Sequence, residues 1–230
     1  MLRFNISKIA YIILAALLVL FRNSANSAFV KQTNEFTCAP VSSCNLISNL
    51  CPECKDNNIE TLAKFEKTSL QGTTAYNLCS GLDKYFKSNN IEADIKYFGI
   101  KNVKKYKVSS SVDFNEIKKL LELGYHGIIN TGIYTINKRG IYIRQWGHYA
   151  NLVAVGNKSL KVYDPYDKNT GFTDWKIDTQ KNIKLKNIND NEKYKSCECY
   201  HSIQSKIDYL EDTETAIING IVLIKIKSPL

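Results

Sequence analysis

The sequence predicts an α+β domain, because helical patterns come first along the chain and strand patterns follow them. Before Gly124, apolar residues recur at helical spacing. After Gly124, short apolar or alternating segments are separated by turn residues, which is typical of strands. The chain contains neither an internal repeat nor a low-complexity block. Residues 29–230 are therefore expected to form one domain, with N-terminal helices packed on an antiparallel β-sheet.

Three helices are expected in the first half of this domain. The first has Pro40 in its first turn, a position that proline suits. The second follows Thr73 as its N-cap and carries its apolar side chains on one face. The third is capped by Asp113 and ended by Gly124. The expected segments are a helix at Pro40–Leu50, a polar connection at Cys51–Glu60, a helix ending near Phe86, a strand at Ile91–Phe98 and a helix at Phe114–Leu123.

Strands dominate after Gly124, and Gly156–Ser159 has the composition of a turn between two of them. Residues 166–215 are polar and weakly periodic, so we expect an insertion there before the last strand. The expected strands are Gly127–Ile136, Ile141–Arg144, Tyr149–Val155, Leu160–Tyr163 and Ile217–Ile226.

The N-terminus has the three-part pattern of a secretory signal peptide. Basic residues precede an apolar segment, Ile9–Phe21, and small and polar residues follow at Asn23–Ala28. The apolar segment is shorter than the roughly 20 residues that cross a bilayer comfortably, which disfavours an uncleaved anchor. We therefore expect residues 1–28 to be removed and the domain to be secreted or periplasmic, without stable membrane insertion after cleavage.

Charge gives little indication of a partner. The full chain has a formal net charge of +9 at pH 7, and lysines are scattered apart from two short groups at 101–107 and 181–186. Nucleic-acid binding would call for a basic stripe interleaved with stacking aromatic residues, and this pattern is missing. We expect no nucleic-acid partner, no cofactor, no metal and a monomeric state.

Seven cysteines agree with an exported protein. In an oxidising compartment an even set pairs and an odd one is left over. If Cys38 is the free thiol, six remain for up to three bridges, with the connectivity open. Zinc is the alternative, because Cys51-Pro-Glu-Cys54 and Cys197-Glu-Cys199-Tyr-His201 resemble ligand clusters. Export favours disulfides over zinc.

Cys38 is the candidate nucleophile. It stands directly before the first expected helix, whose N-terminal partial positive charge favours a thiolate over a thiol. A structural or disulfide-bonded cysteine is the alternative. The nucleophile needs a base, and His148 follows Gly147 at the expected start of a strand. The other histidines, His126 and His201, lie in a loop-like stretch and in the polar segment, and are weaker candidates.

Asp164 ends the strand that pairs with the one opened by His148. Adjacent antiparallel strands can bring the two side chains together, so that the carboxylate orients the imidazole. An aspartate in a turn before Pro165 is the alternative. Gln32, six positions before Cys38, can donate its amide to a developing oxyanion beside the Cys38 backbone N–H.

Taken together, these residues resemble the C39 and C39-like group of papain-like cysteine peptidases. The similarity rests on Gln32, Cys38-Ala-Pro-Val-Ser42, Gly147-His148 and Asp164-Pro165, in this order. It implies a papain-like α+β fold and a Cys-His-Asp site with a glutamine oxyanion donor. It also implies hydrolysis of peptide or amide bonds in a peptide or protein substrate.

The sequence departs from the group's pattern in two ways. Ala39 replaces the usual glycine after the nucleophile, and the additional cysteines and the segment 166–215 lie outside the core pattern. Two other hypotheses stay open. One is acyl transfer to an amine through the same site, and the other is a catalytically idle domain that binds peptides or a protein partner.

Overall fold

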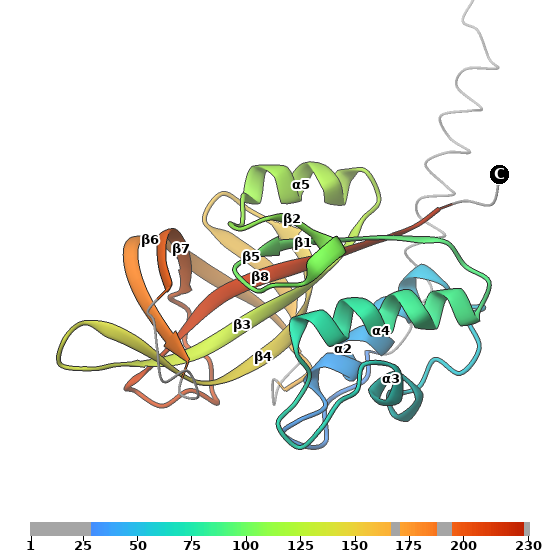
Figure 1. The fold of residues 1–230 in the computed structure, drawn as a ribbon, viewed down its shortest axis with the longest axis horizontal. Coiled ribbons are helices and arrows are strands. Elements are labelled where there is room, and N and C mark those ends of the chain that lie inside the picture. The colour runs from blue at the N-terminus through green and yellow to red at the C-terminus, as the bar shows by residue number, and fades with distance from the viewer. Residues whose placement is uncertain (1–28, 167–170, 188–194, 228–230) are drawn as a thin grey trace, which may run out of the picture.

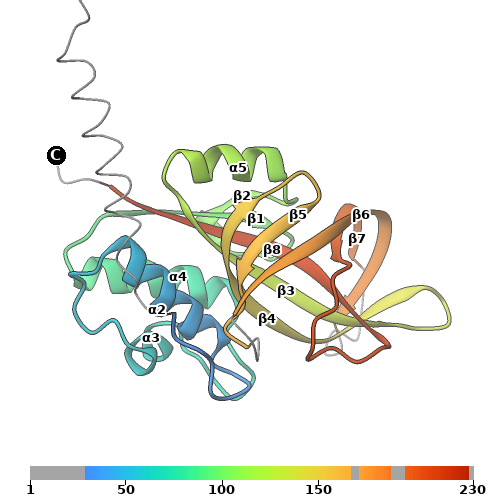
Figure 2. The ribbon, with the colours of Figure 1, turned by 180° about the vertical axis from the view of Figure 1, so that it is seen from behind.

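The computed structural model describes residues 29–166, 171–187 and 195–227 (Figure 1). The signal peptide expected at 1–28 lies outside the described residues. Within them, three helices group at one end of a twisted eight-stranded sheet and α5 covers a different part of it, as both views show (Figures 1 and 2). The predicted α+β class is confirmed, with N-terminal helices packed on a mainly antiparallel sheet.

The bounds of the elements are as follows. The helices are α2 (Cys38–Leu50), α3 (Ile59–Phe65), α4 (Ala75–Ser88), α5 (Phe114–Glu122) and the short 3-10 helix η1 (Lys104–Tyr106). The strands are β1 (Ala93–Gly99), β2 (Lys107–Ser109), β3 (His126–Ile136), β4 (Ile141–Val155), β5 (Ser159–Tyr163), β6 (Phe172–Asn187), β7 (Lys195–Ile203) and β8 (Glu214–Ile226).

The strand order is β2-β1-β8-β3-β4-β5-β6-β7, so the last strand of the chain lies in the middle of the sheet. Most neighbours are antiparallel, whereas β1–β2 and β4–β6 are parallel. A pairing of Ser202 with Ile217 joins β7 to β8 and closes part of the sheet on itself. The site described below lies where β4 and β5 meet α2.

Local sequence signals explain most of the helices. Asp113 caps α5 as predicted, because its carboxylate accepts from the backbone N–H of Asn115 at 2.8 Å. Thr74, and not Thr73, caps α4, through the N–H of Asn77. α3 was not predicted, and it begins after Asn58, whose side chain accepts from the N–H of Thr61.

Two expectations for the strands need correction. The expected pair at 141–144 and 149–155 is one continuous strand, β4, so His148 lies in the interior of a strand and does not open it. The segment 166–215, expected to be a polar insertion, contributes β6 and β7 to the main sheet. Its weak periodicity did not predict these strands, although Trp175 and Leu185 are buried.

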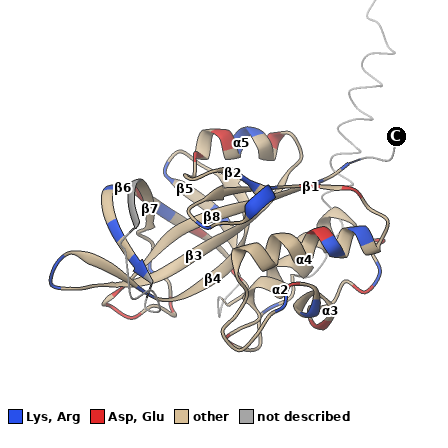
Figure 3. Ribbon diagram, viewed as in Figure 1, with Lys and Arg blue, Asp and Glu red and all other residues tan. Residues whose placement is uncertain are grey.

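Apolar side chains are buried on both faces of the sheet. On one face α2, α3 and α4 cover a cluster that includes Leu82, Phe86 and Tyr149. On the other, α5 contributes Ile117 to a cluster with Phe98 and Trp175. In the described part of the chain, none of the helices has the length and apolar character needed to cross a bilayer. Lysine and arginine are distributed over several elements (Figure 3).

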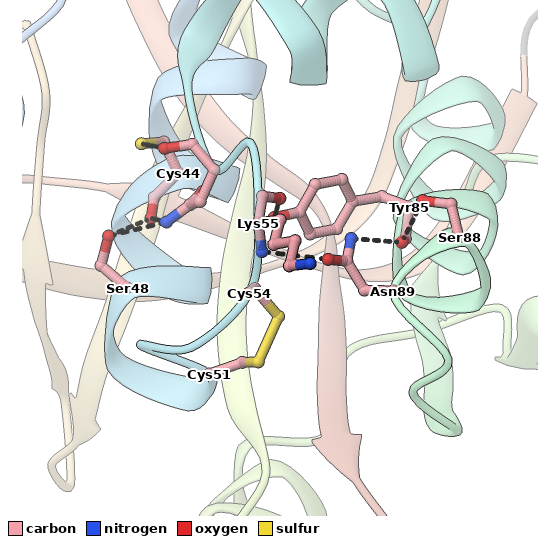
Figure 4. The surroundings of a disulfide bond; sticks show 9 residues. Cys44, Ser48, Cys51, Cys54, Lys55, Tyr85, Ser88 and Asn89 are labelled. Carbon is pink, nitrogen blue, oxygen red and sulfur yellow. Dashed lines mark hydrogen bonds between the residues drawn. A yellow bond between two sulfur atoms is a disulfide. The ribbon is translucent and has the colours of Figure 1, made fainter.

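The cysteines form fewer bridges than their number allows. Cys51 and Cys54 are joined by a disulfide just after α2, and this engages the pair that suggested a zinc cluster (Figure 4). Cys44 and Cys79 are buried thiols outside any bridge. Three bridges among the six cysteines other than Cys38 would need both of them, so that expectation is wrong. The side chain of Cys197 lies outside the described residues.

Candidate active site

Cys38 is the first residue of α2 and is held there by the turn before it. Asn34 makes this turn by accepting from the backbone N–H groups of Phe36 at 3.2 Å and Thr37 at 3.1 Å. The thiol is free and the residue is 4% exposed. The N–H groups in the first turn of a helix have no carbonyl partners within it, so they can donate to a developing negative charge near Cys38.

Two hydrogen bonds between α2 and β4 fix the position of Cys38 relative to His148. The Ser42 hydroxyl, one turn along α2 from Cys38, donates to the carbonyl of Tyr149 at 3.2 Å. The Asn151 amide in turn donates to the carbonyl of Ser42 at 2.8 Å. All these groups are buried, so the helix and the strand are joined directly beside the candidate base.

The predicted pairing of His148 with Asp164 is present. Nε2 of His148 lies 2.7 Å from Oδ1 of Asp164, and both residues are at most 3% exposed. The register of β4 against β5 pairs Asn151 with Tyr163, which places Asp164 directly after the paired strand. The Thr131 hydroxyl donates to the His148 carbonyl at 3.1 Å and adds a link from β3.

The electrostatics of this pair favour charge on both partners. Burial by itself would lower the pKa of His148. The negative charge and hydrogen bond of Asp164 outweigh burial, and Cys38 adds to them, so the pKa of the imidazole rises to about 10. For Asp164, burial would raise the pKa, but the charge and hydrogen bond of His148, together with the Tyr166 and Tyr209 donors, lower it below its usual 3.8. An imidazolium and a carboxylate are therefore expected at neutral pH.

Cys38 lies next to this pair, close enough to the His148 imidazole to favour its charged form and so to raise its pKa. Nε2 is engaged by Asp164, so Nδ1 is the ring nitrogen left for the thiol. Residues from α2, β4 and the end of β5, far apart in the sequence, are thus brought together. This arrangement can pass a proton between the thiol and a reacting group while the carboxylate orients the ring.

Gln32 lies beside these residues, but its amide is engaged locally. Its backbone N–H donates to the Pro165 carbonyl at 2.9 Å, next to Asp164. Its side-chain Nε2 donates to the carbonyl of Asn34, in the turn before Cys38. Oε1 is buried and has no hydrogen-bond partner among the described residues. The role of Gln32 as oxyanion donor stays a prediction.

The segment that carries Gln32 is held from two sides. Asn45 on α2 accepts from the Val30 N–H at 2.7 Å and donates to the Val30 carbonyl at 3.0 Å. Phe29 stacks on Tyr163 with ring centroids 4.2 Å apart. These contacts fix the chain just before Gln32 against the helix of Cys38 and the strand that leads to Asp164.

Sequence reasoning missed two further partners of Asp164. The Tyr209 hydroxyl donates to Oδ2 at 2.7 Å, and the Tyr166 backbone N–H donates to Oδ1 at 3.0 Å. Tyr209 follows β7, in the segment expected to be an insertion, and nothing in its local sequence indicates contact with a residue 45 positions earlier. His201 lies elsewhere and contacts the Val112 carbonyl at 3.0 Å.

Comparison with known proteins gives similarity at the level of fold. No family model matches the chain, and no curated protein matches its sequence. Among solved structures, it is similar to the peptidase domain of Streptococcus ComA, a bifunctional ABC transporter involved in a quorum sensing pathway. That match has 20% identity and a TM-score of 0.39, over 64% of this chain and 84% of that one.

Two more structures give matches of the same kind. A protein from Bacillus anthracis named as a C39-like peptidase matches at 14% identity and a TM-score of 0.45, over 66% of this chain and 86% of that chain. The peptidase domain of Streptococcus mutans ComA matches at 18% identity and a TM-score of 0.34, over 64% and 84%. At these low identities the three matches bear on the fold alone.

Proposed function

We propose that the chain is an exported thiol-dependent peptidase that hydrolyses peptide or amide bonds through Cys38, His148 and Asp164. The observation that supports this most is the buried hydrogen bond between His148 and Asp164, with the free Cys38 thiol next to the imidazole. A nucleophile, a base and a group that orients the base are the minimum that thiol-dependent acyl chemistry needs.

The reaction follows from the charges in this chain. The Cys38 thiolate attacks the carbonyl carbon, a C–S bond forms, and the carbonyl electrons move onto oxygen. The His148 imidazolium gives its proton to the amide nitrogen, and the C–N bond breaks to release an amine. Water, deprotonated by His148, then attacks the thioester and expels the Cys38 sulfur. Asp164 keeps its charge and the orientation of the ring throughout.

The negative oxygen formed during attack needs donors that are already in place. The Cys38 backbone N–H at the start of α2 is one, and the Gln32 amide is the second in this proposal. For Gln32 to donate, one hydrogen of Nε2 stays on the Asn34 carbonyl while the other faces the oxyanion. The two hydrogen bonds of Asn45 with the Val30 backbone, here called the clamp on Val30, support this role. They restrict the backbone from which Gln32 projects.

The second candidate function is a catalytically idle domain that binds a peptide or protein partner. The observation that favours it is the low exposure of the nucleophile, since Cys38 is 4% and His148 3% exposed. A substrate must reach the Cys38 sulfur atom. If the residues around Cys38 do not move aside, the sulfur stays out of reach, and the domain can bind a partner but cannot cleave it.

Alkylation of the mature, oxidised protein with limiting iodoacetamide separates the two functions. Cys44 and Cys79 serve as internal controls because burial raises the pKa of both thiols, that of Cys79 to about 12. An active site predicts rapid labelling of Cys38 at pH 6–7, slow labelling of the controls, and loss of the rapid phase in His148→Ala. An unlabelled Cys38 would support the binding domain.

A turnover assay on a mixed peptide library then tests hydrolysis itself. Cys38→Ala and His148→Ala should each abolish thiol-dependent cleavage while the far-UV circular dichroism spectrum is unchanged. Cys44→Ala is the matched control, because this thiol lies on the same helix outside the proposed chain. Retained cleavage in Cys38→Ala or His148→Ala would rule out the assignment.

A further inference from the structure

Asp164 is held by more donors than the proposed chemistry uses. Oδ1 faces His148 and the Tyr166 backbone N–H, while Oδ2 accepts from the Tyr209 hydroxyl at 2.7 Å. The Tyr209 contact comes from the stretch between β7 and β8, which is remote in sequence from the other residues of the site. A carboxylate that is 1% exposed depends on such donors, because water cannot replace them.

The ring of Tyr209 is fixed by aromatic neighbours as well as by its hydroxyl. Its centroid lies 5.2 Å from the His148 ring, 5.3 Å from Tyr166 and 5.7 Å from Trp146. The Trp146 indole N–H donates to Glu214 at 3.0 Å, at the start of β8. Tyr209 therefore packs against the imidazole and bonds the carboxylate at the same time.

We propose that Tyr209 is a positioning residue of the active site, which holds Asp164 ionised and oriented toward His148 through Oδ2. This inference rests on the proposed function, and it extends the Cys38–His148–Asp164 chain by one member. In this proposal Tyr209 acts through Asp164 and the imidazole ring. Its hydroxyl fixes the second carboxylate oxygen, so that the first is directed at Nε2 of the imidazole.

The effect on pH dependence has a definite sign. The Tyr209 hydroxyl is among the donors that lower the pKa of Asp164. Without that donor the carboxylate takes up a proton at higher pH, and the His148–Asp164 pair is lost earlier on acidification. The other groups that face this pair stay the same, namely Cys38 on His148 and the Tyr166 N–H on Asp164.

Tyr209→Phe tests the proposal, because it removes the hydroxyl and keeps the ring. The ¹⁵N resonance of His148 Nε2 is followed on acidification, together with the pH profile of Cys38 alkylation. The acid transition of both should move up by about one pH unit, which corresponds to about one lost hydrogen bond to a charged group. In the peptidase assay, kcat should fall about tenfold with KM unchanged.

Tyr142→Phe is the control, since Tyr142 lies on β4 but packs on Tyr134 away from the site. It should reproduce the wild-type profiles. Superimposable acid transitions in Tyr209→Phe and wild type would overturn the proposal. A loss of activity without a shift of the acid transition would also overturn it, because it indicates a structural role only. The NMR measurement needs no turnover, so a chain that fails to cleave peptides contradicts the proposed function and still tests Tyr209.

Discussion

Replacing Glu66 by Gln should make the protein more stable at alkaline pH. Glu66 ends α3 and is 0% exposed. Gly81 of α4 packs directly on it, since a Cβ at Gly81 would lie 2.7 Å from the Glu66 Cα. Among the described residues neither carboxyl oxygen has a hydrogen-bond partner within normal geometry, although the Ser43 hydroxyl is close enough to favour the charged form. Burial dominates and raises the pKa of Glu66 to about 8.

The magnitude follows from proton linkage. Between pH 4.5 and about 8 the folded protein keeps a proton on Glu66 that the unfolded chain has lost. The free energy of unfolding therefore falls as the pH rises through this window, by about 5 kcal/mol in total at 1.36 kcal/mol per pH unit. Below pH 4.5 the penalty is absent, and above about 8 it is complete. Glutamine cannot ionise, so Glu66→Gln removes this slope.

Urea unfolding at pH 5, 7 and 9, followed by circular dichroism, measures the effect. The free energy of unfolding of Glu66→Gln minus that of wild type should be larger at pH 7 than at pH 5 and larger again at pH 9, with the rise complete near pH 8 and with equal m values. Other titrating groups, His148 and Asp164 included, are common to both proteins and cancel in the difference. Glu60→Gln is the matched control, because Glu60 lies on the same helix but is exposed beside Lys64. Parallel curves for Glu66→Gln and wild type would refute the reasoning.

Three further variants test the site. In Asp164→Asn, the loss of the charge that raises the pKa of His148 should move the basic limb of kcat/KM to lower pH. Its rate should fall by less than the roughly 10²–10⁴-fold that acid–base catalysis contributes, and an unmoved limb would contradict the pairing. Gln32→Ala should lower kcat by about 10²–10³-fold and leave Cys38 alkylation unchanged, as expected for an oxyanion donor; slower alkylation would point to a structural role. Asn45→Ala should lower kcat by less than Gln32→Ala, with a stability loss of about 1–3 kcal/mol measured by urea unfolding, and full activity would show that the clamp on Val30 is dispensable.

Local chemistry made several elements predictable. Asp113 and Gly124 bound α5 because a side-chain cap and a left-handed glycine act within a few residues. His148 and Asp164 could be paired because two adjacent strands are joined by a short turn, so one hairpin carries both residues. The place of Cys38 at the start of a helix could likewise be predicted, because the helix start depends only on neighbouring residues such as Pro40.

The remaining features depend on contacts between distant parts of the chain. Gly147 interrupts the apolar pattern of β4 and suggested two strands, but β3 pairs with residues on both sides of it, from Tyr142 to Leu152, and keeps the strand continuous. The second half of β6 alternates lysines with the buried Ile183 and Leu185, and it becomes part of the sheet by pairing with β4 and β7. The contact of Tyr209 with Asp164 joins two loops, for which no periodicity exists.

The position of β8 between β1 and β3 affects the order in which the parts of the fold can assemble. β8 is the last strand of the chain, yet it pairs with β1, β3 and β7. A chain that is still being synthesised lacks the strand that joins these parts, and Tyr209 also comes late. Cys38 is therefore synthesised long before the strand that holds β1, β3 and β7 together, and the complete sheet forms late.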